Sequence, residues 1–61
     1  MVKIKITKIH KYDAYYNDRD EIVGCIGFAE NIENTGHGWY SFDFRYDGQW
    51  HRFMYADFEQ V

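Results

Sequence analysis

The stretch Gly38-Trp-Tyr-Ser-Phe-Asp-Phe-Arg-Tyr-Asp-Gly-Gln-Trp-His-Arg-Phe-Met-Tyr55 decides the fold. Asp47-Gly48 at its centre is typical of a two-residue type I′ turn, because both central residues of that turn need a positive φ. Aromatic and polar residues alternate on both sides of the turn, as they do in the strands of a hairpin. The sequence therefore predicts a β-hairpin in which Tyr46 faces Gln49.

This register places most of the aromatic side chains of the hairpin on one face, because successive side chains of a strand point to opposite faces. The facing pairs on that side are Tyr40 with Tyr55, Phe42 with Phe53 and Phe44 with His51. The other face pairs Arg45 with Trp50 and Asp43 with Arg52, and each pair is worth about 0.2–1 kcal/mol. A slip of one residue would exchange the two faces, so we expect a well-defined register with the aromatic face in the core.

The chain has 61 residues, which is enough for one domain, 1–61, near the lower limit for folding without metals or disulfides. Its single cysteine, Cys25, cannot form an intrachain disulfide, and this fits a reducing compartment. The 2 Trp, 6 Tyr and 5 Phe residues supply core volume that so short a chain otherwise lacks. No apolar run could span a membrane and no signal peptide is visible, so we expect a cytoplasmic protein without a membrane partner.

The net charge of −3 at pH 7 argues against a general phosphate binder, but the charge is unevenly placed. Residues 1–11 contain no acid and hold Lys3, Lys5, Lys8 and Lys11. The rest of the chain holds all ten acids against three arginines. The acidic part of the chain is therefore everything after the first eleven residues.

Residues 2–9 predict a first strand, in which Ile4 and Ile6 point inward and the lysines point outward. Ile9 breaks this alternation, so we expect a bulge near Lys8. The lysines on the outer face also discourage edge-to-edge association.

Residues 10–21 predict a polar loop, and residues 21–31 predict a second strand. Ile26 and Ala29 both look inward, although they are three positions apart. Gly27 between them is expected to absorb this mismatch as a bulge or kink, because glycine tolerates unusual dihedrals at low cost.

Gly24 is expected to allow a neighbouring backbone or ring to approach closely. Residues 31–38 predict a loop, because Asn, Thr and two glycines fall within them. Near the end of the chain, Asp57 is expected to start a single 3₁₀ turn that packs Phe58 and Val61 against the core.

The segment Val23-Gly-Cys-Ile-Gly-Phe-Ala29 follows a strand and a long loop, and it fits a G-x-x-G-x-apolar pattern. In this respect the chain resembles SH3-like small barrels of the KOW type, although that family usually has a larger residue where Ala29 sits. The resemblance implies an all-β fold, namely a five-stranded SH3-like barrel with a long first loop and a C-terminal 3₁₀ turn.

The size and style of the chain are also similar to those of small phage-encoded proteins of Gram-positive hosts, many of which bind and redirect a host protein. This similarity implies a host-interacting protein in the host cytoplasm. Residues 11–15 resemble the aromatic–acidic loop with which signalling SH3 domains hold proline-rich peptides. The rest of that groove is missing, since there is no paired tryptophan and no Pro-x-x-Tyr near the end.

The candidate metal ligands lack the paired spacing of a metal site. They are His10, His37, His51 and Cys25. Cys25 with a histidine could form a catalytic dyad. However, a free thiol within a strand usually behaves as a small hydrophobe, and so small a barrel lacks a deep pocket. We therefore expect no metal, no cofactor and no enzymatic activity.

Nucleic-acid binding is the alternative function, because barrels of this family often contact RNA or DNA. The residues that could form a stacking platform are Arg45, Trp50, His51 and Arg52, with Trp39 beside them. Asp43 in the middle of this platform and the excess of acids argue against it, because affinity for nucleic acid rests largely on phosphate neutralisation.

Protein binding is the function that we favour, because the loop of residues 10–21 and Trp39 offer more aromatic surface than one small core needs. The candidate contact residues are Tyr12, Asp13, Tyr15, Tyr16, Asp18, Asp20 and Trp39. The acids could steer the module toward a basic surface of a larger host protein, which it would inhibit or adapt. In the alternative interpretation, two of the three tyrosines pack inward and the acids are merely solvated. Self-association through the first strand or the aromatic surface is a third class.

Overall fold

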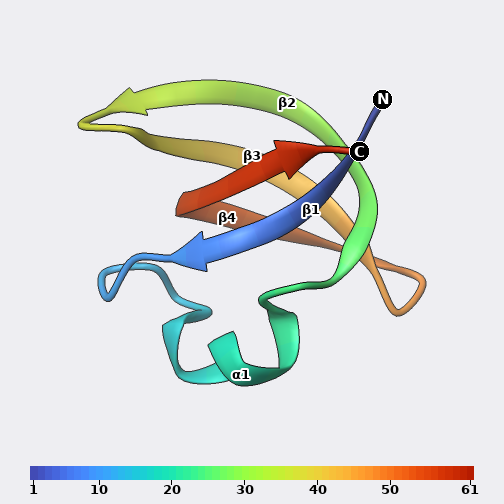
Figure 1. Ribbon diagram of the computed structural model, residues 1–61, viewed down its shortest axis with the longest axis horizontal. Helices are drawn as coiled ribbons and strands as arrows, with labels where there is room; N and C mark the ends of the chain where they lie inside the picture. The colour runs from blue at the N-terminus through green and yellow to red at the C-terminus, as the bar shows by residue number, and fades with distance from the viewer.

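The computed structural model describes residues 1–61 and consists mainly of β-strands. The elements are β1 (Val2–Ile9), η1 (Tyr16–Asp18), α1 (Arg19–Ile22), β2 (Ile26–Gly36), β3 (Trp39–Tyr46) and β4 (Gln49–Gln60). Each strand pairs antiparallel with the next, and β4 returns to pair with β1, so that the sheet closes on itself (Figure 1). The expectation of an all-β fold is confirmed.

The β3–β4 hairpin has the predicted turn. Asp47 has a φ of 54° and Gly48 has a φ of 72°, which are the positive values that a type I′ turn requires. The predicted register holds from Tyr46 opposite Gln49 through Arg45 opposite Trp50 to Phe42 opposite Phe53.

Beyond Phe42 the register shifts, and Tyr40 pairs with Ala56 instead of the predicted Tyr55. The expectation that Tyr55 faces the core was therefore wrong. Ala56 is fully buried in its place, and 40 % of Tyr55 is exposed. The reason is that β4 bends here to leave β3 and join β1, and an irregularity in the ladder increases the local twist.

Four strands form the sheet instead of the five predicted, and the C-terminal residues extend β4 instead of forming a 3₁₀ turn. The single strand β4 pairs with β3 over its first part and with β1 over its second part, from Ala56 opposite Ile9 to Gln60 opposite Ile4. Because this ladder uses the backbone groups of the last residues, no 3₁₀ turn forms there. The short 3₁₀ helix of this chain is η1.

The prediction of a loop over residues 31–38 was wrong, because β2 continues to Gly36 and only a tight turn separates it from β3. Two register irregularities, one between Glu30 and Glu33 and one between Asn34 and Gly36, accommodate this polar part of the strand. The strand also begins later than expected, at Ile26.

Ala29 is fully buried as predicted, whereas Ile26 is 55 % exposed, so the expectation for Ile26 was wrong. The close approach expected at Gly24 occurs instead at Gly27, where an added Cβ would lie 2.7 Å from the carbonyl oxygen of Arg45. Nothing lies within 4 Å of a Cβ at Gly24.

The core lies inside the closed sheet and consists of Ile4, Ile6, Ile9, Ile22, Ala29, Phe42, Phe44, Phe53 and Ala56. Phe42 and Phe53 stack with ring centroids 5.4 Å apart. The register of β1 shifts between Ile6 and Lys8, which confirms the predicted bulge and turns Ile9 inward. No helix of this structure has the length and apolar character needed to cross a membrane.

Candidate functional site

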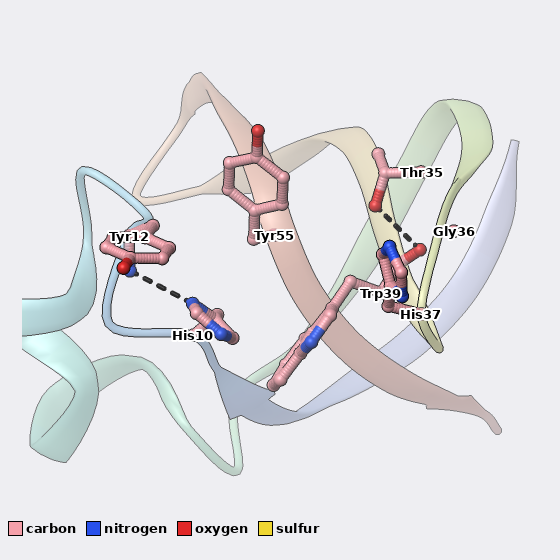
Figure 2. Close-up of a pocket in the computed structure, with 7 residues that line it drawn as sticks. All are labelled: His10, Tyr12, Thr35, Gly36, His37, Trp39 and Tyr55. Atoms are coloured by element: carbon pink, nitrogen blue, oxygen red, sulfur yellow. Dashed lines mark hydrogen bonds between the residues drawn. The ribbon is translucent and has the colours of Figure 1, made fainter.

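One pocket opens on the surface, where the chain leaving β1, the β2–β3 turn and β4 meet (Figure 2). Its lining residues are His10, Tyr12, Thr35, Gly36, His37, Trp39 and Tyr55. The pocket has a volume of about 260 Å³. Pockets for whole small molecules usually measure about 300–1,000 Å³, so this one lies just below that range.

His10 lies at the centre of the aromatic wall, between Tyr12 and Trp39 (Figure 2). Its ring centroid is 4.7 Å from that of Trp39, edge to face, and 5.1 Å from that of Tyr12. The backbone N–H of Tyr12 donates to Nδ1 of His10 over 3.1 Å, which orients the imidazole. The three rings therefore form one continuous surface.

The β2–β3 turn that carries Trp39 has positive φ at three consecutive residues, Gly36 (90°), His37 (58°) and Gly38 (81°). Glycine adopts such values at no steric cost, which explains why two glycines flank His37. The hydroxyl of Thr35 donates to the carbonyl oxygen of Trp39 over 2.9 Å and closes the turn. Trp39 is thus presented on a constrained loop.

Tyr55 lines the pocket from β4 because the register shift turns it outward. The backbone N–H of His10 donates to the carbonyl oxygen of Tyr55 over 2.9 Å, which ties the two segments together. Their ring centroids lie 6.2 Å apart.

Only 5 % of the surface of Asp13 is exposed. Its carboxylate acts as a clamp that joins β4 to the loop that follows β1. One carboxylate oxygen accepts the backbone N–H groups of Met54 and Tyr55, each over 2.8 Å, and the other accepts the N–H of Tyr15 over 2.8 Å. We predicted that Asp13 contacts a partner. Its burial and its three hydrogen bonds give it a structural role instead, that of holding β4 against the loop that carries Tyr12.

Tyr15 and Tyr16 are half-buried and pack against the core, as the alternative interpretation of the tyrosines expected. The Tyr15 ring lies 4.6 Å from that of Phe53, and its hydroxyl is 3.1 Å from Nδ1 of His51. The guanidinium of Arg19 covers the Tyr16 ring at 4.0 Å. Asp18 and Asp20 are exposed on η1 and α1 and do not line the pocket. Of the predicted contact residues, the structure brings only Tyr12 and Trp39 together in the pocket.

The alternative platform for nucleic acid is divided between two faces of the hairpin. The guanidinium of Arg45 lies 5.5 Å from the centre of the Trp50 ring, and both residues are exposed. Arg52 pairs with Asp43 over 3.3 Å. His51 is half-buried, and its Nε2 lies 3.2 Å from the carbonyl oxygen of Tyr46. Arg45 and Trp50 thus remain together, while His51 faces the packed side.

Two lysines border the pocket although the chain is acidic overall. Nζ of Lys8 lies 5.5 Å from the centre of the Trp39 ring, and Nζ of Lys11 lies 5.5 Å from that of Tyr12. Neither lysine has a carboxylate within 4.0 Å, whereas Lys5 pairs with Glu59 over 3.0 Å. No acid lines the pocket, and Asp57 lies opposite Lys8 in the β1–β4 ladder without forming an ion pair with it.

Two pKa shifts occur on the hairpin, away from the pocket. The hydrogen bond donated by Asn31 over 2.8 Å, with a smaller contribution from Arg52, holds the pKa of Asp43 below its usual value. The negative charge of Asp47 is the largest cause that raises the pKa of Tyr46. No group of three or more His, Cys, Asp and Glu residues is placed to hold a metal ion. Sγ of Cys25 donates to the carbonyl oxygen of Glu21 over 3.2 Å.

Sequence reasoning missed three features of the site. His10 was considered only as a metal ligand, Tyr55 only as a core residue, and Lys8 and Lys11 only as part of the basic N-terminal segment. The clustering of two lysines with His10 and Tyr12 in Lys8-Ile-His-Lys-Tyr12 is the signal that could have identified His10 and the lysines.

Comparison of the chain with protein-family models, with curated proteins and with solved structures finds no match.

Proposed function

We propose that this protein is a small protein-binding module that modulates a larger protein by binding part of it in the aromatic pocket. The observation that carries the proposal is that Tyr12, Trp39 and Tyr55 come from three separate segments and line one open pocket. None of the three belongs to the hydrophobic core. Tyrosine and tryptophan are favoured anchors of protein interfaces, because they bury a large area at a low cost in conformational entropy.

The geometry supports a partner that inserts part of itself, because the pocket volume suits one or two side chains. Two built-in supports hold the rings in place before binding. Asp13 fixes the loop of Tyr12 against β4, and the Thr35 hydroxyl closes the turn of Trp39. A contact surface that is already ordered loses little entropy on association. We assign the module no catalysis of its own, because the pocket combines aromatic rings with imidazoles and no activated nucleophile.

The finer description of the fold is part of the same proposal. Three features support an SH3-like small barrel: four antiparallel strands that close on themselves, a long connection after β1 and a tight β3–β4 turn. In this barrel the bent β4 takes the place of two strands, because it pairs with both β3 and β1. The resemblance to small phage proteins supports a cytoplasmic host protein as the partner, which the module would inhibit or adapt.

Affinity capture from a bacterial lysate tests this function, with immobilised wild type compared with Tyr12→Ala/Trp39→Ala. Trp50→Ala is the matched control, because Trp50 is an exposed tryptophan outside the pocket. We expect a partner that is retained by the wild type and by Trp50→Ala and lost from the double variant. Circular dichroism establishes that each variant is folded. The absence of any partner, or a partner that the double variant retains, contradicts the proposal.

Single-stranded nucleic acid is a second candidate, favoured by the exposed Arg45–Trp50 pair. A gel-shift experiment at low salt with oligo-dT and oligo-U tests it. Binding that weakens steeply with salt and is lost in Trp50→Ala supports this candidate. Binding that is unchanged by Trp50→Ala removes it.

A further inference from the structure

We infer that the pocket recognises an acidic peptide segment, with a large apolar or aromatic side chain of that segment in the pocket and carboxylates on Lys8 and Lys11. This inference rests on the proposed function and names the class of partner. The predicted charge of the partner is therefore the opposite of the one that the sequence suggested, since acids in the loop of residues 10–21 had indicated a basic partner.

The local charge of the pocket carries the inference. Lys8 stands over Trp39 at one end of the aromatic wall and Lys11 stands over Tyr12 at the other end, with His10 between them. Neither ammonium group is neutralised by a carboxylate within 4.0 Å. Because the chain carries −3 overall, this cationic border is a local departure from its average charge. A carboxylate at either end of the wall would meet an unpaired cation.

The same arrangement disfavours a cationic ligand. Aromatic rings attract a cation through their faces, but an ammonium group already stands over the rings of Trp39 and Tyr12 at 5.5 Å. An incoming lysine, arginine or methylated lysine would be placed beside a like charge. The pocket therefore discriminates in favour of an anionic segment.

Peptide carboxylates fit this border better than a phosphate backbone does. Affinity for nucleic acid grows with the number of phosphates that are neutralised, and only two lysines border the pocket. The acids elsewhere on the chain would repel a continuous polyanion. A peptide can instead carry two carboxylates that flank one apolar side chain. This order matches the pocket, in which Lys8 and Lys11 stand at the two ends of the aromatic wall.

Binding measurements with a set of labelled peptides in solution test the inference. The probes are fluorescein-labelled nine-residue peptides with Phe, Tyr, Trp or Leu at the centre and with Glu, Lys or Ser at all flanking positions, together with the oligonucleotide dT12. Fluorescence anisotropy measures binding to the wild type, to Lys8→Glu/Lys11→Glu and to Lys3→Glu/Arg45→Glu. The last variant is the matched control, because it makes the same change in net charge at exposed residues outside the pocket.

We expect at least one Glu-flanked peptide to bind the wild type about tenfold more tightly than its Lys-flanked counterpart, since like charges replace attractions at both ends. Lys8→Glu/Lys11→Glu should lose about tenfold in affinity for that peptide, and the control variant should lose much less. The affinity should also fall as salt rises. Preference for Lys-flanked or Ser-flanked peptides, binding only of dT12, or binding of no probe overturns the inference.

The failure of this inference is distinguishable from the failure of the proposed function. A lysate partner that depends on Tyr12 and Trp39 but is retained by Lys8→Glu/Lys11→Glu would leave the module as a protein binder and remove the acidic class of partner. A partner that is lost in both double variants and retained by the control variant supports both conclusions.

Discussion

The β3–β4 hairpin and the pocket are both built from aromatic side chains, but different interactions hold them in place. In the hairpin, Phe42 and Phe53 face each other across a regular ladder next to a two-residue turn. In the pocket, His10 follows β1, whereas Trp39 and Tyr55 lie on β3 and β4 beyond the register shift of the hairpin. Single contacts such as the Asp13 clamp hold these segments together. The comparison shows that the regular ladder next to the turn places Phe42 and Phe53 in the core, whereas beyond the register shift Tyr55 points outward and lines the pocket (Figure 2).

The largest effect is expected in the hairpin, where Phe53→Ala should cost about 3–5 kcal/mol of unfolding free energy because it removes a fully buried ring and leaves a cavity. A chain of this size has a total stability of roughly 3–9 kcal/mol, so this loss removes a large part of it. Urea denaturation followed by circular dichroism measures the loss. A cost below 1 kcal/mol would show that the hairpin core does not carry the fold.

The Asp13 clamp should give the next largest effect. Asp13→Ala leaves three part-buried backbone N–H groups without their carboxylate acceptor, and we expect a loss of about 3 kcal/mol in unfolding free energy. Hydrogen exchange at the amides of Met54 and Tyr55 should accelerate. Asp18→Ala is the control, because Asp18 is exposed and its side chain makes no capping hydrogen bond to α1. Equal behaviour of the two variants would rule out the clamp.

Gly27→Ala tests the close packing of β2 on the hairpin. The added Cβ would lie 2.7 Å from the Arg45 carbonyl oxygen and 2.9 Å from the Phe44 ring, so we expect a loss of about 1–3 kcal/mol as the two strands move apart. Ile26→Ala at the exposed neighbouring position should change stability by less than about 1 kcal/mol. Thermal unfolding of both variants measures the difference, and a harmless Gly27→Ala would contradict this packing.

Tyr12→Ala should separate stability from function. Tyr12 is 75 % exposed, so we expect a change within about 0.5 kcal/mol in unfolding free energy. Partner capture should nevertheless be lost, because the aromatic wall loses one of its three rings. A Tyr12→Phe variant keeps the ring and should retain the partner. Loss of stability together with loss of binding would place Tyr12 in the core instead of on the contact surface.

The smallest effect concerns pH. The Asn31 hydrogen bond, and to a lesser extent Arg52, lower the pKa of Asp43 in the folded chain. The ionised carboxylate therefore stabilises the fold fully at pH values above the pKa of about 3.9 that Asp43 has in the unfolded chain. That stabilisation is lost as the pH falls through the lower folded pKa. Asn31→Gly suits the φ of 55° at this position and removes the amide, so it should flatten the pH dependence of stability below about pH 4. An unchanged pH profile would contradict this account.

Two of the seven residues that line the pocket were predicted as contact residues from the sequence alone. Tyr12 and Trp39 stood out as excess aromatics, and both line the pocket. Asp13 stood out in the same way but is buried, because its carboxylate satisfies backbone groups of β4 that are distant in the sequence. No local pattern reports such a partner. Lys8 and Lys11 acquire their significance only when the rings of Trp39 and Tyr12 lie beneath them.

The sequence by itself determined the all-β character, the β3–β4 turn, the register next to that turn and the inward direction of Ile4 and Ile6. Each of these depends on interactions between near neighbours, namely the positive φ of Asp-Gly and the alternation of side chains along a strand. Only the tertiary structure decided that β4 pairs with two strands, that Tyr55 turns outward and that Asp13 is buried. These features depend on the closure of the sheet, in which the bend of one strand is set by partners that lie far away in the chain.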